Sequence, residues 1–113
     1  MASYTRVNRA VTTSDDMLTA ELAELVLGWR AAPGRFIKSG RSWIPRWRFR
    51  PFHELADAFQ LLERVADCFS LTGTTKKGFI AEVQVADRRG KASGKQIART
   101  VTTAVARALG LRV

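Results

Sequence analysis

Basic and aromatic side chains alternate between Arg35 and Phe52, and their types and spacing are the ones in this chain that could do chemistry. The segment RFIKSGRSWIPRWRFRPF holds six basic residues and no acidic ones. If residues 41–50 form an extended strand, alternate side chains share a face. This would give an arginine face of Arg46, Arg48 and Arg50 and an aromatic face of Trp43, Trp47 and Phe49. Three arginines in such a row could each neutralise a phosphate.

Further basic residues would enlarge this surface if neighbouring strands and turns bring them alongside. The candidate positions for binding an anionic partner are Arg35, Lys38, Arg41, Arg46, Arg48, Arg50, Lys76, Lys77, Arg88, Arg89 and Lys91. We expect the basic residues at 76–77 and 88–91 to lie in turns, where such side chains also add solubility and protect sheet edges.

Two interpretations of the aromatic face stay open. In the first, which we favour, Trp43 and Trp47 pack beneath the helices and the arginines lie in solvent. In the second, a bulge at Pro45 turns one tryptophan outward, where its ring could stack on a base of single-stranded nucleic acid. The solvent exposure of the two indoles decides between a core hairpin and a binding surface.

No other set of residues indicates catalysis or metal binding. The chain has one histidine and one cysteine, too few for the usual zinc site. His53 lies near Glu54 and Asp57, but spacing places no nucleophile beside it. Cys68 stands in an apolar setting and is predicted to be a small buried side chain. We therefore expect no enzymatic activity, no metal and no cofactor.

The composition is that of a globular domain with an anionic partner. Of 113 residues, 46% are hydrophobic and 26% are charged, and the net charge of +9 would attract nucleic acid or acidic proteins. No apolar run is long enough to span a bilayer, and the N-terminus lacks the apolar core of a secretory signal. A single cysteine suits a reducing compartment, so we expect a cytoplasmic protein.

Apolar periodicity gives the elements that would position the basic and aromatic residues. A first helix begins at Ser14 and ends at Gly28, and its buried stripe consists of Leu18, Leu22, Leu25, Val26 and Trp29. A hairpin follows, with strands over 35–38 and 42–49 joined at Ser39-Gly40. Pro51 is predicted to be the first residue of a second helix over 51–66.

The C-terminal part is predicted as a second hairpin followed by a helix. Its strands cover 68–72 and 79–85, and the last helix runs over 94–109 with Ser93 as its cap and Leu109-Gly110-Leu111 as its stop. The order α-β-β-α-β-β-α predicts an α+β fold with a mostly antiparallel sheet and helices packed on it. We expect one domain over 14–113, preceded by a loose arm over 1–13.

Several of these motifs resemble the phage ABA sandwich domain, a family of small phage-encoded proteins. The family has a helix ending in Gly-Trp, here Leu27-Gly28-Trp29, then a tryptophan-containing hairpin with Trp43 or Trp47 in that place. Pro51-Phe52 and the alanine-rich end over 100–109 match its later helices, and the resemblance covers about residues 17–110. The chain departs from it at Phe52-His53, where the family carries a Ser or Thr cap. The resemblance implies a helix–sheet sandwich and a phage or prophage origin, and it favours core tryptophans; it supplies no activity.

Together, these features predict a small phage or prophage-derived protein of the bacterial cytoplasm that binds a partner and is not an enzyme. The favoured partner is an acidic protein, recognised by the basic surface without insertion into a membrane. The alternative is DNA or RNA, bound by the arginine face of the hairpin.

Overall fold

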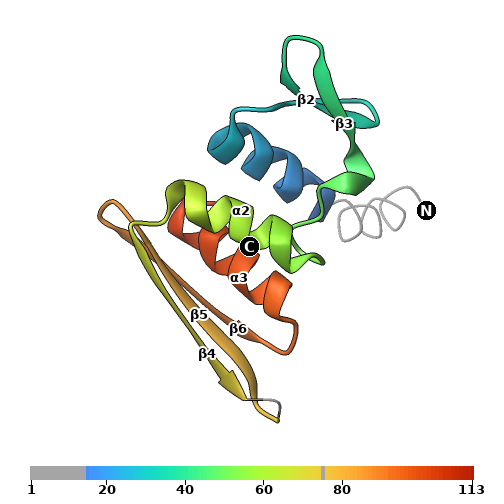
Figure 1. Cartoon of the computed structure of the whole chain (residues 1–113). Coiled ribbons are helices and arrows are strands. Elements are labelled where there is room, and N and C mark those ends of the chain that lie inside the picture. The colour runs from blue at the N-terminus through green and yellow to red at the C-terminus, as the bar shows by residue number, and fades with distance from the viewer. Residues whose placement is uncertain (1–14, 75) are drawn as a thin grey trace, which may run out of the picture.

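The computed structural model describes residues 15–74 and 76–113 (Figure 1). The arm predicted over 1–13 lies outside these residues. A helix over 15–22 continues as the π-helical turn η1 (Ala23–Leu27). The elements that follow are β1 (Arg30–Ala32), β2 (Arg35–Ser39), β3 (Ser42–Pro45), the 3₁₀ turn η2 (Arg46–Arg48), α2 (Leu55–Val65), β4 (Cys68–Thr74), β5 (Gly78–Val85), β6 (Arg88–Gly94) and α3 (Ile97–Ala108).

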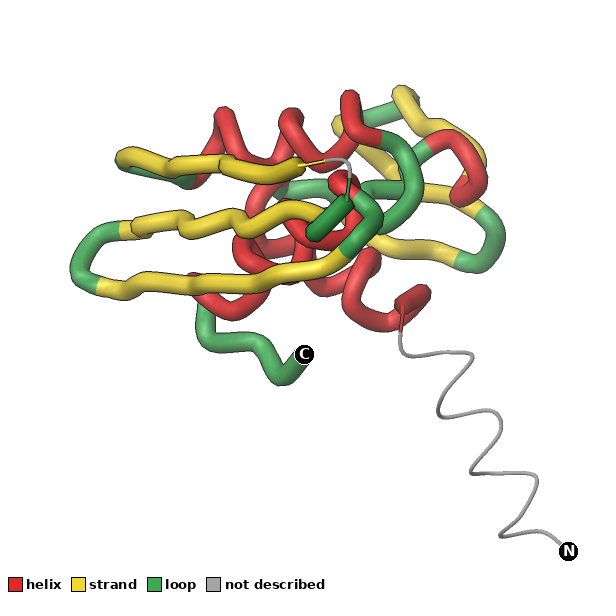
Figure 2. The backbone as a smooth tube through the Cα atoms, turned by 90° about the horizontal axis from the view of Figure 1, so that it is seen from below, coloured by secondary structure: helices red, strands yellow, loops and turns green. Residues whose placement is uncertain are grey.

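Two three-stranded antiparallel sheets lie at opposite ends of the molecule, with the helices between them (Figure 1). The first sheet has the order β1-β2-β3 and the second has the order β4-β5-β6. Helix α3 packs on β5 and β6, α2 packs on α3, and η1 contacts both α2 and β1. Figure 2 shows the strands of the second sheet side by side across the helices. The predicted α+β class with antiparallel strands is therefore confirmed.

Each predicted hairpin gains a third strand, and the strands form two separate sheets where one was predicted. Strand β1 lies between the predicted first helix and the predicted hairpin, where no element was expected, and β6 covers residues predicted as a turn and as the start of the last helix. The small residues of β6 give it a weak strand propensity. Gly90 is required because α3 lies very close: a Cβ at this position would stand 2.1 Å from the carbonyl oxygen of Ala104. Ser93 is consequently a strand residue and not a helix cap, and α3 begins only after Gln96.

The first helix buries a different stripe from the predicted one near its end. Leu18, Leu22 and Val26 are buried as expected, whereas Leu25 is 62% exposed. The wider π turn causes this shift. The Gly28 amide donates to the carbonyl of Ala23, five residues back, and not to the carbonyl four residues back, as it would in an α-helix. Gly28 itself has the predicted left-handed conformation, with φ 71°.

The segment before α2 is a turn, so Pro51 is not the first residue of a helix. The amides of His53 and Glu54 both donate to the Arg50 carbonyl, at 2.9 and 2.7 Å, and α2 begins after Glu54. The Arg50 amide in turn donates to Asp57 Oδ2 at 2.9 Å, which ties this turn to the first turn of α2. Pro51 is buried within the turn.

The core is one cluster of buried side chains that runs from the first helix to α3. Trp29, Phe36 and Phe49 pack edge to face or tilted beneath the first sheet, with ring centroids 5.1–6.0 Å apart. At the end of α3, the amides of Leu111 and Gly110 close back on earlier carbonyls at 2.9 and 3.0 Å, which confirms the predicted glycine stop.

Cys68 is exposed, contrary to the prediction that it is buried. It opens β4, an outer strand, and pairs with Gln84 of β5. Its Sγ lies 3.6 Å from Gln84 Oε1 on the side of the sheet away from α3. Apolar neighbours in the sequence therefore do not bury this thiol, because they point to the other face of the strand.

Candidate anionic-partner interface

The predicted arginine and aromatic faces of residues 41–50 do not form, because the strand ends at Pro45. Residues 46–48 turn as η2, and regular alternation stops there. Phe49 is buried as predicted, but Trp43 is 51% exposed and Trp47 is 71% exposed. The favoured interpretation of the two tryptophans as core residues is therefore wrong, because β3 and η2 present one exposed indole each.

Trp43 lies on the outer face of the first sheet. The strand register places Arg30, Ile37 and Trp43 in one row across the three strands. The opposite face carries Phe36, which is fully buried. The guanidinium of Arg35 lies 5.2 Å from the centre of the Trp43 ring, within the range of a cation–π contact. We call the row and this arginine, namely Arg30, Arg35, Ile37 and Trp43, the Trp43 platform.

Two basic residues of the hairpin are occupied within the fold. Arg46 Nε donates to the carbonyl of Ala32 at 3.2 Å, and its guanidinium lies 4.8 Å from the centre of the Phe36 ring. The ammonium of Lys38 lies 5.4 Å from the Trp29 ring. The contacts of Arg46 hold the hairpin onto its core, so Arg46, which is half-buried, contributes less to a free binding surface than Arg41, which is exposed in the turn.

Trp47 borders an open pocket of about 560 Å³ between the hairpin and the first helix. The guanidinium of Arg48 lies 6.0 Å from the Trp47 ring. We call this cavity the Trp47 pocket; its lining residues are Asp15, Asp16, Thr19, Gly34, Phe36, Arg46, Trp47, Phe49, Arg50, Phe52 and His53. The pocket therefore combines aromatic walls with both signs of charge.

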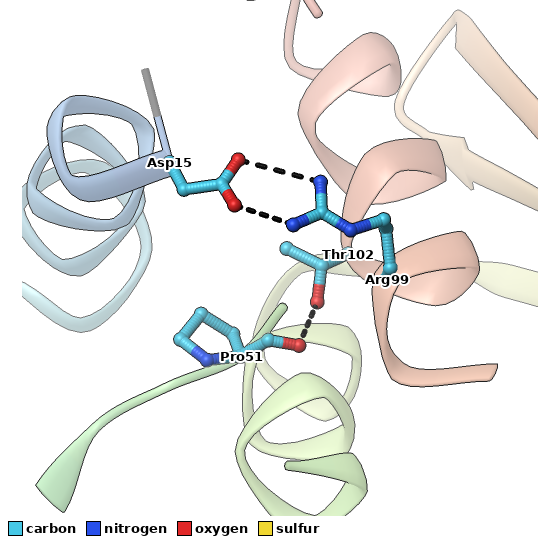
Figure 3. A network of polar contacts seen from close by, with 4 residues as sticks. All are labelled: Asp15, Pro51, Arg99 and Thr102. Carbon is cyan, nitrogen blue, oxygen red and sulfur yellow. Dashed lines mark hydrogen bonds and ion pairs between the residues drawn. The ribbon is translucent and has the colours of Figure 1, made fainter. Parts of the chain in front are cut away.

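The hairpin and the segments that flank it in the sequence carry positive charge only. Between residues 25 and 53 the chain has seven basic residues and no acidic one. Within residues 15–74 and 76–113, the one salt bridge joins Arg99 to Asp15 (Figure 3). A second oxygen–nitrogen contact of that pair measures 3.3 Å. None of the hairpin arginines therefore has a salt-bridge partner among these residues. The Trp43 platform thus presents a positive and aromatic surface.

The structure does not gather all eleven predicted basic residues in one place. Arg35, Lys38, Arg41, Arg46, Arg48 and Arg50 belong to the hairpin, the 3₁₀ turn and the segment after it, whereas Lys76, Lys77, Arg88, Arg89 and Lys91 belong to the second sheet at the far end of the molecule (Figure 1). Lys76 and Lys77 lie in a turn as predicted, but Arg88, Arg89 and Lys91 lie on β6. In the strand register, Lys91 of β6 lies opposite Glu82 of β5.

Arg30 is the platform residue that was not predicted. It belongs to β1, whose three residues are too few to show alternation. The available signal is the Pro33-Gly34 pair, because Pro-Gly commonly forms a tight turn between two strands. Had that turn been paired with the strand after it, Arg30 would have fallen opposite Ile37.

The described residues contain no group of three or more His, Cys, Asp or Glu side chains placed to hold a metal ion. No helix in the described ranges is both long enough and apolar enough to cross a membrane.

Comparison with solved structures finds a similar fold in a phage protein from Bacillus cereus ATCC 14579, determined at 2.0 Å. The TM-score is 0.69 at 15% sequence identity, over 85% of this chain and 87% of the phage protein. This chain shares that fold. No protein-family model matches the sequence, and a search of curated proteins gives no match either. The resemblance to the phage ABA sandwich domain is thus supported as a phage protein fold and not as that named family.

Proposed function

We propose that this chain is a non-enzymatic protein of phage or prophage origin that binds single-stranded nucleic acid through the Trp43 platform. The observation that carries the proposal is the exposed Trp43 ring on a sheet face that also holds Arg30 and Arg35. The shared fold and the Gly-Trp motif support the phage origin, and with it a place in the cytoplasm of the bacterial host.

The chemistry of the platform suits a strand whose bases are unpaired. Stacking of a base on an aromatic side chain contributes about 1–3 kcal/mol and needs no particular sequence. The neighbouring guanidiniums can neutralise phosphates, which releases counterions and makes binding depend on salt. Because Arg35 already rests against the indole, the ring is held in place before a base arrives.

The proposal predicts how three variants bind a fluorescent oligo-dT strand, measured by anisotropy. Wild-type affinity should fall steeply between about 50 and 200 mM salt. Trp43→Ala should bind about 5- to 150-fold more weakly, since the stacking energy is lost. Arg35→Gln should bind more weakly and lower the slope of log affinity against log salt by about one.

Arg89→Gln is the matched control for this experiment. It removes the same charge from an exposed position on the second sheet, far from the Trp43 platform. Its binding should equal that of the wild type. Equal weakening by Arg35→Gln and Arg89→Gln would mean that only total charge matters, and an absence of binding at low salt would also contradict the proposal.

An acidic protein is the second candidate partner, and the Trp47 pocket is the observation that favours it. The pocket is concave and lies beside an exposed tryptophan and arginines. Tryptophan and arginine are the residue types that often contribute most of the binding energy at protein interfaces. In that case Trp47→Ala should abolish retention of one defined protein from a nuclease-treated bacterial lysate, and Trp43→Ala should leave it bound. Retention that disappears with nuclease treatment alone would exclude this candidate.

A further inference from the structure

Strand β4 is an unprotected edge of the second sheet. Among the residues that the structure describes, it pairs with β5 alone, over seven consecutive residue pairs without a bulge. None of its residues, Cys68 to Thr74, is charged or a proline, and all except Leu71 are exposed. Soluble proteins usually protect such an edge with charges, prolines or bulges, because its open backbone groups can pair with another strand.

The other sheet edges carry that protection. Strand β6 contains Arg88, Arg89 and Lys91. Strand β3 ends in Pro45 and has an irregular register with β2, and β1 has three residues. Among the edge strands described, only β4 therefore lacks such protection. Its backbone groups could pair with another strand.

We propose that β4 pairs antiparallel with β4 of a second copy of this chain, about a two-fold axis at Leu71. The pairing would join the two second sheets into one continuous six-stranded sheet. Around this axis Phe69 of one copy stands opposite Gly73 of the other, and Cys68 stands opposite Thr74. A two-fold axis of this kind makes the strand its own complement.

Side chains along β4 fit this arrangement. Phe69 is 52% exposed, although it lies on the face toward the helices and touches Phe59 there. The ring of Phe79 lies over Gly73, since a Cβ at that glycine would stand 2.5 Å from Phe79 Cδ1. Across the axis, Phe69 of one copy would therefore cover Gly73 and meet the Phe79 ring of the other, which would bury both aromatic side chains.

Charges at the two ends of β4 select the antiparallel direction and favour a second copy as the occupant. Asp67 precedes the strand, and Lys76 and Lys77 follow it. Antiparallel pairing brings Asp67 of each copy toward the lysines of the other. Parallel pairing would instead set Asp67 against Asp67 and lysine against lysine, which is unfavourable.

Sedimentation velocity over roughly a hundredfold range of protein concentration tests this pairing. The wild type should form a dimer. Thr72→Lys should weaken the dimer about tenfold, because it brings two lysines diagonally across the new strand pair. Ser70→Lys with Thr72→Lys sets lysines directly opposite each other and should leave only monomer, with an unchanged far-UV circular dichroism spectrum.

Ser93→Lys is the matched control, because Thr72 and Ser93 flank the same residue, Ile80, on opposite edges of the sheet. It should dimerise like the wild type. A wild type that is monomeric throughout, or a double-lysine variant that still dimerises, would overturn the proposal. Equal losses from Thr72→Lys and Ser93→Lys would overturn it as well.

Disulfide formation tests the register. Thr74→Cys, oxidised with diamide, should give a covalent dimer in which the Cys68 thiol of one copy and the introduced thiol of the other form an S–S bond. Diamide takes up the two hydrogens. Wild-type Cys68 and Ser93→Cys should give no cross-link, since the two native thiols would stand about 20 Å apart at ~3.3 Å per residue. Cross-linking of the wild type to the same extent would exclude this register.

Discussion

Thr102 joins α3 to the turn before α2 through one buried hydroxyl. Its Oγ1 donates to the Pro51 carbonyl at 2.6 Å, and the side chain is fully buried (Figure 3). Thr102→Val keeps the shape but leaves that carbonyl unpaired, which should lower the free energy of unfolding by about 1–3 kcal/mol. Urea denaturation followed by circular dichroism measures the change. Thr102→Ser, which keeps the hydroxyl, should retain the hydrogen bond and lose only the methyl contacts.

Single residues show how far the sequence determines the candidate site. The excess of arginine in the hairpin and the exposure test for Trp43 and Trp47 could be stated from the sequence. Which tryptophan faces outward could not, because Pro45 can end a strand or bend it. The hydrogen bond from Arg46 to the Ala32 carbonyl could not be predicted either, because it joins residues that are 14 apart in the sequence.

The turn between β5 and β6 contains a residue with a strained backbone, Ala86. Val85 pairs with Arg88, so Ala86 and Asp87 form a two-residue loop, and Ala86 has φ 55°. An L-residue with a side chain pays about 1–2 kcal/mol for a left-handed conformation, whereas glycine adopts it readily. Ala86→Gly should therefore raise the free energy of unfolding by about 0.5–1 kcal/mol, after the greater chain entropy of glycine is subtracted.

Thermal or urea unfolding compares this variant with Asp87→Gly. Asp87 has no positive φ, so its replacement relieves nothing and should be neutral or destabilising. The backbone amide of Ala86 donates to Asp67 Oδ2 at 2.7 Å, and a glycine amide can make the same hydrogen bond. A variant less stable than the wild type at position 86 would show that the turn is not strained.

Elements with their own local signals were predicted, and elements that depend on a neighbour were not. Strand β5 alternates clearly, and Gly28 and Gly110 mark helix ends, so all three are where the sequence placed them. Strand β6 exists because α3 and β5 lie beside it, and its Gly90 reflects that close packing and not strand propensity. The π turn of η1 also depends on packing, because it places Val26 and Leu27 in the core and leaves Leu25 outside it.

At the scale of the whole molecule, one continuous core joins the two sheets. The buried cluster includes Leu22 of the first helix, Phe52 of the turn before α2 and Val105 of α3. Arg99 strengthens this junction, because it pairs with Asp15 and its guanidinium lies 5.1 Å from the Phe52 ring. We therefore expect the halves to unfold together, as small domains with one core usually do.

The positions of the tryptophans make that expectation measurable. All three lie between residues 29 and 47, so their fluorescence reports on the first sheet and its helix, whereas circular dichroism is dominated by the helices, including α2 and α3. The two urea curves should coincide. The variant with Ser70→Lys and Thr72→Lys suits the measurement, because dimer dissociation would otherwise add a dependence on concentration.

Asp15→Asn then probes the junction itself. The ion pair is partly exposed, at 42% for Arg99 and 36% for Asp15, so its loss should cost less than about 1 kcal/mol. Because one core holds both halves, this loss should shift the fluorescence and circular dichroism curves equally. The contrary result would be a fluorescence transition at a lower urea concentration than the circular dichroism transition, with a wider gap between the two in Asp15→Asn. It would mean that the Trp43 platform belongs to a unit that unfolds separately. The continuous cluster from Leu22 to Val105 argues for the coincident result.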